Sequence, residues 1–384
     1  MSRLDTHNPD LQRLARPQVR QLASYNAGLS AETVRERYGL QRVAKLGSNE
    51  NPLGPAPAVS TAMAQACAQV ALYPDANCGL LRQALAKKLQ VPTDHLVFGN
   101  GSEDLLSIIS RVFLDHGDEV VTVVPSFGLH FIYPIAAGAQ VIGVPMRADG
   151  SFDVPAMLAA LSSKTRLLMF SCPSNPVGTT LNAAELGQLL AALPADCLLV
   201  FDEAYYEYAQ HEADYPDCLG IIQASGKPFV LLRTFSKAYA LAGLRIGYGI
   251  VSDPLLADLI DRLRTPFNIN RVAQAAALAA LADEAHLNRG LAHVASERTR
   301  MAQALAQLEV HAVPSHANFL YFATPFEAEA LNLALLAEGV IVKPWREARY
   351  TRYLRVSIGS VEDNDLFLAA LAKVLATEHK RTSG

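Results

Sequence analysis

The sequence has few cysteines, no excess of basic residues and no long uninterrupted apolar run. Its five cysteines include no CxxC pair and are odd in number, so neither a disulfide framework nor a metal site is expected. A net charge of −4 at pH 7 argues against a nucleic-acid partner, which requires a basic surface. No run approaches the ~20 apolar residues of a membrane helix, and the first residues lack the apolar core of a secretory signal. We therefore expect a cytoplasmic protein without a nucleic-acid or membrane partner.

Apolar runs and amphipathic segments alternate through the middle of the chain. The 384 residues are 51% hydrophobic and 18% charged, a composition typical of globular proteins. Apolar strands separated by helix-length segments predict a mainly parallel sheet with helices on both faces. The expected fold class is α/β, with a seven-stranded sheet. The predicted strands are His95–Phe98, Glu119–Val124, Gln140–Val144, Leu167–Phe170, Leu198–Phe201, Phe229–Leu232 and Arg245–Val251.

The pattern changes near Asp253, where long alanine- and leucine-rich segments with helical spacing begin. Short apolar stretches follow at residues 318–324, 339–345 and 353–359, and then a final helix from Glu362 to about Thr377. This order predicts a smaller α+β domain after the parallel sheet. The expected division is an N-terminal arm at residues 1–45 that contributes to the small domain, a large domain at 46–285 and a small domain at 286–384.

Polar residues follow five of the predicted strands at their carboxyl ends. In an open parallel sheet, ligands bind at this edge. One such residue carries little information, but five strand ends together predict a shared pocket. The segments are Gly99–Glu103, Pro125–Phe127, Ser171–Pro176, Asp202–Tyr205 and Arg233–Lys237.

The segment GNGS at residues 99–102 precedes an amphipathic helix and allows two interpretations. Ser102 can cap the helix by accepting from the N–H groups of its first turn. Alternatively, free N–H groups and the helix dipole hold a phosphate. The dinucleotide pattern GxGxxG fits poorly, because Asp104 stands where the third glycine belongs.

Other residues at these strand ends have ordinary structural explanations when taken singly. Asp202 can form an ion pair, Lys237 can be solvated, Phe127 can belong to the core and Asn175 can lie in a turn. Together they match the needs of pyridoxal 5′-phosphate (PLP). That cofactor requires an amine for its aldehyde, a carboxylate at its ring nitrogen, an aromatic face and donors for its phosphate. Lys237 would then bind the aldehyde carbon of the ligand, and Arg245 would bind the phosphate of the same ligand.

Several motifs resemble the fold-type I PLP-dependent aminotransferases, and among them the histidinol-phosphate aminotransferases. The resemblance extends from about Tyr25 to Gly359, in family order, and is more specific for the fold than for the substrate. The motifs are SNENPLGP at 48–55, YPD at 73–75, GNGSEDLL at 99–106, CPSNPVG at 172–178, DEAYYEY at 202–208, TFSKAYALAGLRIGY at 234–248 and LRVSIG at 354–359.

The resemblance implies a role for each cofactor contact. Lys237 matches the lysine that binds the PLP aldehyde carbon and moves the substrate proton, and Asp202 matches the carboxylate that keeps the pyridine nitrogen protonated. Asn175 and Tyr205 match the pair that hydrogen-bonds the phenolic oxygen of PLP, and Phe127 matches the ring stacked on the pyridine. The implied phosphate cup consists of Gly101, Ser102, Glu103, Ser236 and Arg245.

The resemblance also implies substrate and partner contacts. Tyr73 matches a tyrosine that reaches the cofactor phosphate of the neighbouring subunit, so a homodimer with shared active sites is expected. Arg355 matches the arginine that binds the substrate α-carboxylate, a role that suits a bidentate guanidinium. Asn49 lies in a segment that approaches the substrate, and Tyr25 matches a tyrosine that binds the phosphate of histidinol phosphate.

The chain departs from the family pattern after the segment GVIV, where an arginine for the substrate phosphate is expected. Lys343 stands there instead. Lysine is a competent phosphate cation but lacks the planar fork of arginine. Arg346, Arg349 or Arg352 offer further positive charge close by.

The resemblance implies a reaction in two halves. L-Glutamate gives up its amino group and leaves as 2-oxoglutarate, and imidazole-acetol phosphate takes the group to become L-histidinol phosphate, a step of histidine biosynthesis. Three alternatives stay open: an aminotransferase for aromatic or other amino acids, a PLP-dependent decarboxylase of phosphorylated amino acids, and a non-catalytic PLP-binding module. The combination of lysine, aspartate and arginine disfavours the last of these.

Overall fold

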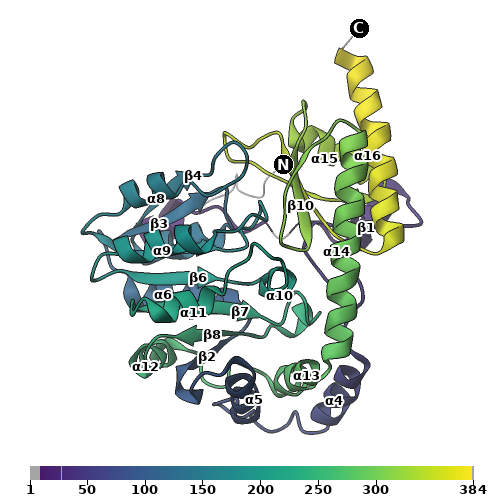
Figure 1. Cartoon of the computed structure of the whole chain (residues 1–384). Coiled ribbons are helices and arrows are strands. Elements are labelled where there is room, and N and C mark those ends of the chain that lie inside the picture. Colours follow the sequence, from purple (N-terminus) through teal and green to yellow (C-terminus); the bar gives the residue numbers. More distant parts are fainter. Residues whose placement is uncertain (1–8, 27, 383–384) are drawn as a thin grey trace.

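The structure is a computed structural model of the chain and describes residues 9–26 and 28–382. A seven-stranded sheet with its helices lies beside a four-stranded sheet with its own, and the long helix α14 (Glu284–Gln307) runs along both (Figure 1). Residues 1–8 and 27 of the predicted N-terminal arm lie outside the described residues, as do 383–384 of the predicted small domain. The expectation about a secretory signal falls largely on that first segment.

The large sheet has the strand order β2-β8-β7-β6-β5-β3-β4. Neighbouring strands from β7 to β4 are parallel, whereas β8 is antiparallel to β2 and β7. The predicted mainly parallel, seven-stranded sheet is therefore confirmed. Its strands are β2 (Leu96–Gly99), β3 (Glu119–Val124), β4 (Gln140–Pro145), β5 (Thr165–Ser171), β6 (Leu198–Asp202), β7 (Phe229–Thr234) and β8 (Gly247–Val251).

Two strands begin later than predicted, each because of the local backbone. His95 belongs to a 3-10 turn, η1 (Thr93–His95), so β2 starts at Leu96. Arg245 has a left-handed backbone with φ of 55° and follows a second 3-10 turn, η2 (Ala242–Leu244). That conformation is incompatible with an extended strand, so β8 starts at Gly247.

Side chains of the central strands alternate between two cores, because helices cover both faces of the sheet. Along β5, Leu167 and Met169 belong to one core, and Leu168 and Phe170 to the other. The first core includes α6 (Ser102–Phe113), α7 (Leu129–Ala137) and α12 (Pro254–Leu263); the second includes α8 (Val154–Ala160), α9 (Ala183–Ala192) and α11 (Cys218–Ala224).

The alanine-rich segment after Asp253 forms two helices, α12 and α13 (Arg271–Ala282), separated by residues 264–270. Pro266 lies in this break, where its ring prevents continuation of a helix. Asn270 then caps α13 by accepting from Ala273 N–H at 2.8 Å. Helices α4 (Pro57–Cys67) and α5 (Gly79–Leu89) pack against α13.

The small sheet has the order β12-β13-β10-β9, with antiparallel neighbours. Its strands are β9 (Ala312–Val313), β10 (Phe319–Ala323), β12 (Lys343–Pro344) and β13 (Tyr353–Ser357). Helices α14, α15 (Ala328–Ala337) and α16 (Val361–Thr382) pack together beside it, and β1 (Ala44–Lys45) pairs in parallel with β11 (Val340–Ile341). The division at residue 285 falls inside α14, and the three-part division stays our proposal.

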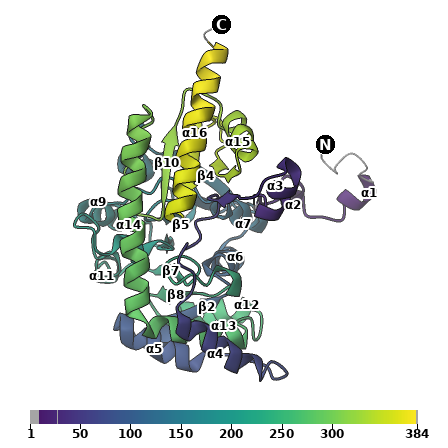
Figure 2. The ribbon, with the colours of Figure 1, turned by 90° about the vertical axis from the view of Figure 1, so that its right-hand side faces the viewer.

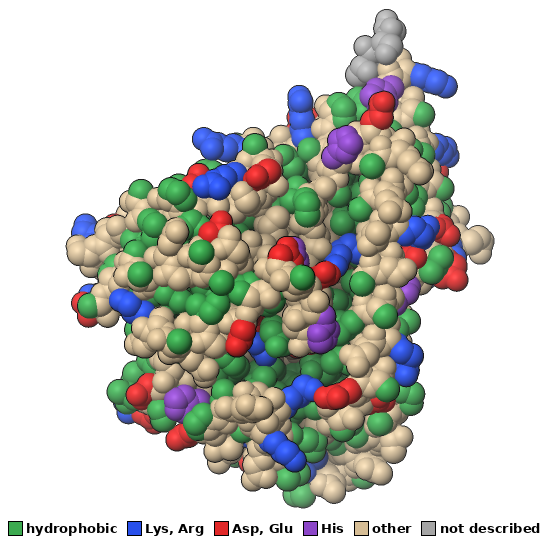
Figure 3. Space-filling model, in the orientation of Figure 1, with side chains coloured by type: hydrophobic (Ala, Val, Ile, Leu, Met, Phe, Trp, Pro, Cys, Tyr) green, Lys and Arg blue, Asp and Glu red, His purple; other side chains and the backbone are tan. Residues whose placement is uncertain are grey.

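The N-terminal segment leaves the body of the molecule beside α7 (Figure 2). It contains α1 (Pro9–Gln12), α2 (Pro17–Arg20) and α3 (Ala31–Tyr38), and Arg16 Nη2 donates to Ala137 O at 3.2 Å. Acidic and basic side chains are interspersed on the face shown in Figure 3. Among the described residues, no helix is long and apolar enough to span a bilayer, and no group of three or more His, Cys, Asp and Glu side chains is arranged to bind a metal ion.

Candidate active site

A pocket of about 640 Å³ lies between the carboxyl ends of the large sheet's strands and the small sheet. This volume is in the range of small-molecule sites. Every residue predicted for the site except Tyr73 lines it. The walls come from residues 23–26 and 47–50, the start of α6, the ends of β3, β5, β6 and β7, the η2 turn, and the segment that includes β12 and β13.

Helix α6 begins at the pocket without a side-chain cap. Gly101 is its N-cap residue, with a φ of 78° that favours glycine, and Ser102 is already helical. The interpretation of Ser102 as the cap is therefore wrong. Since the first N–H groups of a helix have no intrahelical partner, they are available to an anion at this wall of the pocket.

Glycines allow Arg245 to approach these N–H groups. A Cβ at Gly101 would lie 2.6 Å from Arg245 Nη2, and a Cβ at Gly247 would clash with the first amide nitrogen of α6. Arg245 Nη1 donates to Ser236 Oγ at 3.4 Å, and its Nη2 pairs with Glu103 at 3.0 Å. Backbone donors, a hydroxyl and a guanidinium thus form a cradle for an anion of phosphate size.

Asp202 ends β6 and is buried at the floor of the pocket. Its Oδ1 accepts from Ala204 N–H at 3.0 Å, and its Oδ2 lies 3.5 Å from His130 Nε2. His130 lies on α7, is fully buried, and has its Nδ1 3.0 Å from Ser126 Oγ. The hydrogen bond from Ala204 therefore restrains the carboxylate, and the imidazole of His130 lies beside its second oxygen.

Lys237 follows β7, and its side chain lines the pocket. The Nζ donates to Ser48 O at 3.2 Å and lies 5.9 Å from the centre of the Tyr205 ring. Burial, and then the charge of Arg355, lowers the pKa of Lys237 to about 8. About a tenth of the amine is then neutral at pH 7, in the form that acts as nucleophile and base.

Arg355 and Tyr205 connect the two sheets across the pocket. Arg355 is buried on β13, with Nη1 donating to Asn175 Oδ1 at 2.6 Å and Nη2 to Gly47 O at 2.8 Å. Its buried Nε has no hydrogen-bond partner within the part of the chain that the structure describes. Tyr205 accepts from Asn49 Nδ2 at 2.9 Å, and burial raises the pKa of Tyr205 to about 12, so its hydroxyl stays a donor.

Lys343 and Arg355 lie directly opposite each other on β12 and β13. Opposed residues of an antiparallel pair project from the same face of the sheet, so two cations stand side by side. Lys343 Nζ donates to Asn26 O at 2.7 Å. Burial, and then the charges of Arg355 and Arg346, lowers the pKa of Lys343 to about 8.

The three arginines after Lys343 differ in position. Arg346 lines the pocket and pairs with Glu329, whereas Arg349 and Arg352 do not line it. Arg352 pairs instead with Glu327 at 3.4 Å on the surface. Additional positive charge at the pocket therefore comes from Arg346.

Tyr25 and Phe127 form the aromatic wall, and Tyr73 lies elsewhere. The Tyr25 and Phe127 rings meet edge to face at 6.2 Å, and Phe127 meets His130 in the same way at 5.7 Å. The Tyr73 side chain is 78% exposed and stacks on Phe267 with 4.6 Å between ring centres. Within one chain, Tyr73 does not reach the pocket.

Two buried features near the pocket were not predicted from the sequence. One is His130, the second residue of α7, which lies four residues after Ser126. The other is an ion pair at the ends of neighbouring strands, with Arg233 Nη2 2.7 Å from Glu203 Oε2. The sequence did contain a signal for this ion pair, because Glu203 directly follows one apolar strand and Arg233 lies at the end of another.

The donors around the pocket fit PLP group by group. The cradle at α6, which an added Cβ at Gly101 would fill, suits the phosphate. The buried carboxylate of Asp202 suits a protonated ring nitrogen, and the partly neutral amine of Lys237 suits an aldehyde. Arg355 lines the pocket, and its guanidinium suits a substrate anion.

Comparisons with known proteins agree with this geometry. Residues 41–371 match the family model for aminotransferases of class I and II. The chain is 48% identical to histidinol-phosphate aminotransferase 1 of Mesorhizobium japonicum, over 94% of this chain and 98% of that protein. It is also 48% identical to histidinol-phosphate aminotransferase 3 of Rhizobium meliloti, over 94% of this chain and 97% of that protein.

A solved structure extends the agreement to three dimensions. The histidinol-phosphate aminotransferase of Sinorhizobium meliloti, crystallised in complex with PLP, matches with a TM-score of 0.85 and 32% identity, over 94% of this chain and 98% of that one. The fold-type I architecture implied by the motifs is thereby confirmed. The chain belongs to the family of class I and II aminotransferases.

Proposed function

We propose that the chain is a PLP-dependent aminotransferase that interconverts imidazole-acetol phosphate plus L-glutamate with L-histidinol phosphate plus 2-oxoglutarate, a step of histidine biosynthesis. The observation that carries the proposal is the pair of cations formed by Lys343 and Arg355 at one wall of a PLP-shaped pocket. Eight relatives named histidinol-phosphate aminotransferase, 38–48% identical over at least 92% of this chain, support it.

Each predicted cofactor contact has a defined task in this proposal. When bound, PLP supplies an aldehyde that exchanges amino groups and a protonated ring that withdraws electrons. Asp202, held by His130, would keep that ring nitrogen protonated. Gly101, Ser102, Glu103, Ser236 and Arg245 would hold the phosphate, Phe127 would cover the ring face, and Asn175 and Tyr205 would bind the phenolic oxygen.

Lys237 would transfer the proton in both halves of the reaction. Its pKa of about 8 leaves part of the amine neutral near neutral pH. The neutral Nζ would accept the proton from the substrate's α-carbon, the carbon bonded to the amino nitrogen. The charge of Arg355 helps to keep the pKa of Lys237 low, and the carbonyl of Ser48 orients the Nζ.

The two cations on the small sheet match the different anions of the two substrates. Glutamate carries its α-carboxylate directly on the reacting carbon, which suits the buried fork of Arg355. In histidinol phosphate, a phosphate ester group, CH2–O–phosphate, takes that place, so its anion extends farther from the reacting carbon. Lys343 lies beside Arg355 on the neighbouring strand, where this longer group would extend, and Tyr25 and Asn49 line the same pocket.

A substrate panel tests the proposed acceptor. With L-glutamate as donor, we expect kcat/KM for imidazole-acetol phosphate to exceed that for phenylpyruvate by at least about a hundredfold, because only the former has a phosphate for Lys343. A preference for phenylpyruvate would instead favour an aromatic aminotransferase. Release of carbon dioxide from a phosphorylated amino acid, without 2-oxoglutarate, would favour a decarboxylase.

Replacement of the lysine tests the proposed chemistry. Lys237→Ala should abolish the visible absorbance of lysine-bound PLP and lower kcat by at least about 10³-fold, because both nucleophile and base are lost. Lys373→Ala, on the surface of α16 where Lys373 pairs with Glu338, should change neither quantity. A Lys237→Ala protein that keeps the absorbance band would contradict the assignment.

We also propose a homodimer in which Tyr73 reaches the partner's phosphate cradle. An exposed apolar surface around this residue supports a protein partner. Its exposed members include Val70, Leu72, Tyr73, Leu80 and Phe267. Light scattering should give twice the chain mass, and a monomer that binds PLP with full affinity would exclude a shared site.

A cytoplasmic location is the last part of the proposal. All five cysteines are free thiols in the structure, and four of them are buried. A reducing compartment keeps thiols in this state. Recovery of the active enzyme in a membrane or secreted fraction would contradict this location.

A further inference from the structure

The loop that carries Tyr73 is held by a segment distant in the sequence. The Tyr73 loop (residues 73–78) precedes α5, and the clamp segment (residues 264–274) joins α12 to the first turn of α13. The contacts between them are the ring stack of Phe267 on Tyr73 and hydrogen bonds from Arg264 to Ala76 O at 3.1 Å, from Arg271 to Tyr73 O at 2.8 Å and from Gln274 to Asp75 O at 2.9 Å. The position of Tyr73 therefore depends on the clamp segment.

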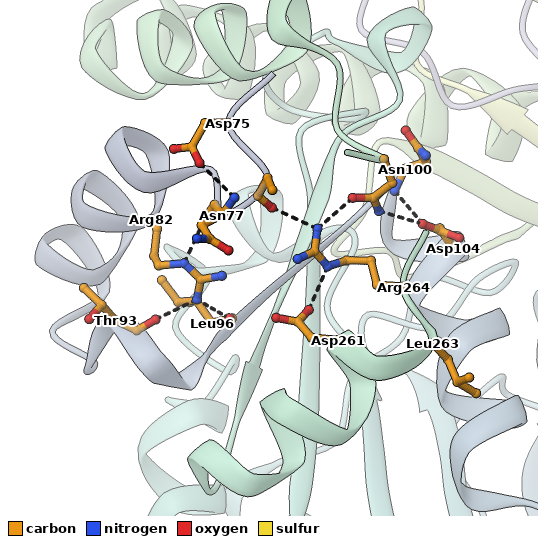
Figure 4. Close-up of polar contacts among 12 residues, drawn as sticks. Asp75, Asn77, Arg82, Thr93, Leu96, Asn100, Asp104, Asp261, Leu263 and Arg264 are labelled. Carbon is orange, nitrogen blue, oxygen red and sulfur yellow. Dashed lines mark hydrogen bonds and ion pairs between the residues drawn. The ribbon is translucent and has the colours of Figure 1, made fainter. Parts of the chain in front are cut away.

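Arg264 also has contacts directed toward the pocket. Its side chain is 11% exposed, and its Nε pairs with Asp261 at 2.7 Å. Its Nη1, which donates to Ala76 O, also donates to Asn268 Oδ1 at 3.0 Å, and Asn268 Nδ2 donates to Asp104 Oδ2 at 3.3 Å. Figure 4 shows Arg264 between the Tyr73 loop and Asp104. We refer to Arg264, Asn268 and Asp104 as the relay.

The relay ends on the residue immediately before the phosphate cradle. Asp104 Oδ2 accepts from Asn100 N–H at 2.9 Å (Figure 4). Asn100 O in turn accepts from Arg245 Nη2 at 3.4 Å. Both peptide groups that flank the Asn100 Cα are therefore fixed, directly before Gly101. Asp104 is the residue that interrupts the GxGxxG pattern, and these two contacts give its carboxylate a structural purpose.

We propose that Arg264 and Asn268 are positioning residues for two cofactor phosphates. Through Asp104 they fix the cradle of their own chain, and through Ala76 Arg264 fixes the loop that presents Tyr73 to the partner's cradle. The inference rests on the proposed homodimer and PLP cofactor. The relay contacts neither Lys237, which would bind the aldehyde, nor the cations Lys343 and Arg355. Its residues should therefore affect binding of the cofactor phosphate and not binding of the aldehyde.

Binding of PLP and of pyridoxal, which lacks the phosphate, tests the first part. Arg264→Ala and Asn268→Ala should each weaken PLP binding by about tenfold, because a loosened cradle loses part of its hydrogen bonding to the anion. Pyridoxal binding should change by less than about twofold. The control is Arg262→Ala, two residues earlier in the last turn of α12, where Arg262 pairs with Asp258 on the surface. Unchanged PLP binding, or equal loss of both ligands, would overturn the proposal.

Mixed dimers test the second part. In each, one chain carries Lys237→Ala, so a single lysine-bearing site reports PLP binding by absorbance. When Arg264→Ala is on the lysine-bearing chain, it disturbs only the phosphate cradle of the reporting site. When Arg264→Ala is on the other chain, it disturbs only the Tyr73 loop that reaches the reporting site. We expect weaker PLP binding in both arrangements, whereas Asn268→Ala should act only from the lysine-bearing chain. An effect of Arg264→Ala from one chain alone would overturn its double role.

The wild-type protein separates the possible failures. If it is monomeric or does not bind PLP, the proposed function fails before any variant is compared. If it is a dimer with bound PLP and the variants behave as wild type, only the relay fails. Arg264→Lys, which keeps a charge beside Asp261, replaces Arg264→Ala if that variant does not fold, and it should weaken PLP binding while preserving pyridoxal binding.

Discussion

Lys343 provides the charge that the family pattern expects from an arginine, but it loses that charge far more readily. A guanidinium stays protonated throughout the physiological range, whereas burial and two neighbouring arginines bring the pKa of Lys343 down to about 8. A lowered pKa means that the cation is present below pH 8 and is lost as the pH rises through that value. The residue at this position therefore determines how phosphate recognition depends on pH.

We predict that Lys343→Arg flattens the pH dependence of acceptor binding. In the wild type, KM for imidazole-acetol phosphate should rise by about tenfold between pH 7 and pH 9, because the Lys343 amine is deprotonated over that range. KM for L-glutamate, which Arg355 binds, provides the internal control and should rise less. Steady-state kinetics across this range decide the matter, and a KM for imidazole-acetol phosphate that rises as steeply in the variant as in the wild type would refute it.

Individual site residues were predictable where the strand-end rule or a motif singled them out. Asp202 and Lys237 follow apolar strands, so their convergence on one pocket required only a parallel sheet. His130 was missed because its importance comes from packing: it lies in the first turn of α7, and only the folded chain brings its Nε2 to 3.5 Å from Asp202. The facing positions of Lys343 and Arg355 depend on strand register, which the separation in sequence does not encode.

At the scale of elements, the phosphate cradle is a junction of α6 with β8. The strand lies so close to the first turn of the helix that a methyl group at Gly247 would meet the backbone of Gly101 and Ser102. Neither backbone can move without displacing the donors of the cradle. Close packing of these two elements, more than any single side chain, sets the shape of the anion site.

We predict that Gly247→Ala weakens PLP binding by at least about tenfold and lowers the free energy of unfolding by about 1–3 kcal/mol, as overpacking does. Gly187→Ala is the matched control, because Gly187 lies in α9 with open space around its Cα. That change should leave PLP binding intact and stabilise the fold by about 0.5–1 kcal/mol. Titration with PLP and chemical denaturation measure both effects; a Gly247→Ala protein with wild-type affinity would show that the cradle tolerates the methyl group.

Element positions were predicted well where hydrophobic patterning was strong and poorly at their ends. The central strands β5, β6 and β7 were found because they are buried on both faces and read as continuous apolar runs. The start of β8 was misplaced because the left-handed backbone of Arg245 serves the cradle and has no signature in hydropathy. The short strands β9, β11 and β12 exist through tertiary pairing that local sequence does not specify.

At the scale of the whole molecule, a buried ion pair lies in the interior beneath the pocket. Glu203 and Arg233 are almost fully buried, and Arg233 also lies 3.3 Å from the centre of the Tyr206 ring. Tyr215 donates to the second oxygen of Glu203 at 2.8 Å. Burial of such a pair costs desolvation free energy. Removal of one partner destabilises the fold strongly, because the other charge is then buried without a counter-charge.

We predict that Glu203→Gln lowers the free energy of unfolding by about 3–5 kcal/mol, because it leaves the buried guanidinium of Arg233 without a counter-charge. Glu327→Gln, which disrupts an exposed pair with Arg352, should cost less than about 1 kcal/mol. Chemical denaturation at a fixed protein concentration compares the two. Equal, small effects would mean that water or a neighbouring group compensates the buried charge.

The long helix α14 has a mechanical consequence for the enclosure of substrate. Its 24 residues make a rod of about 36 Å that begins beside α13 and runs to the four-stranded sheet carrying Arg355 (Figure 1). A pivot of only about 5° at its first turn would displace the far end by about 3 Å, by the geometry of a rigid lever of that length. A hinge near residue 284 would thus turn slight angular motion into opening and closing of the cleft.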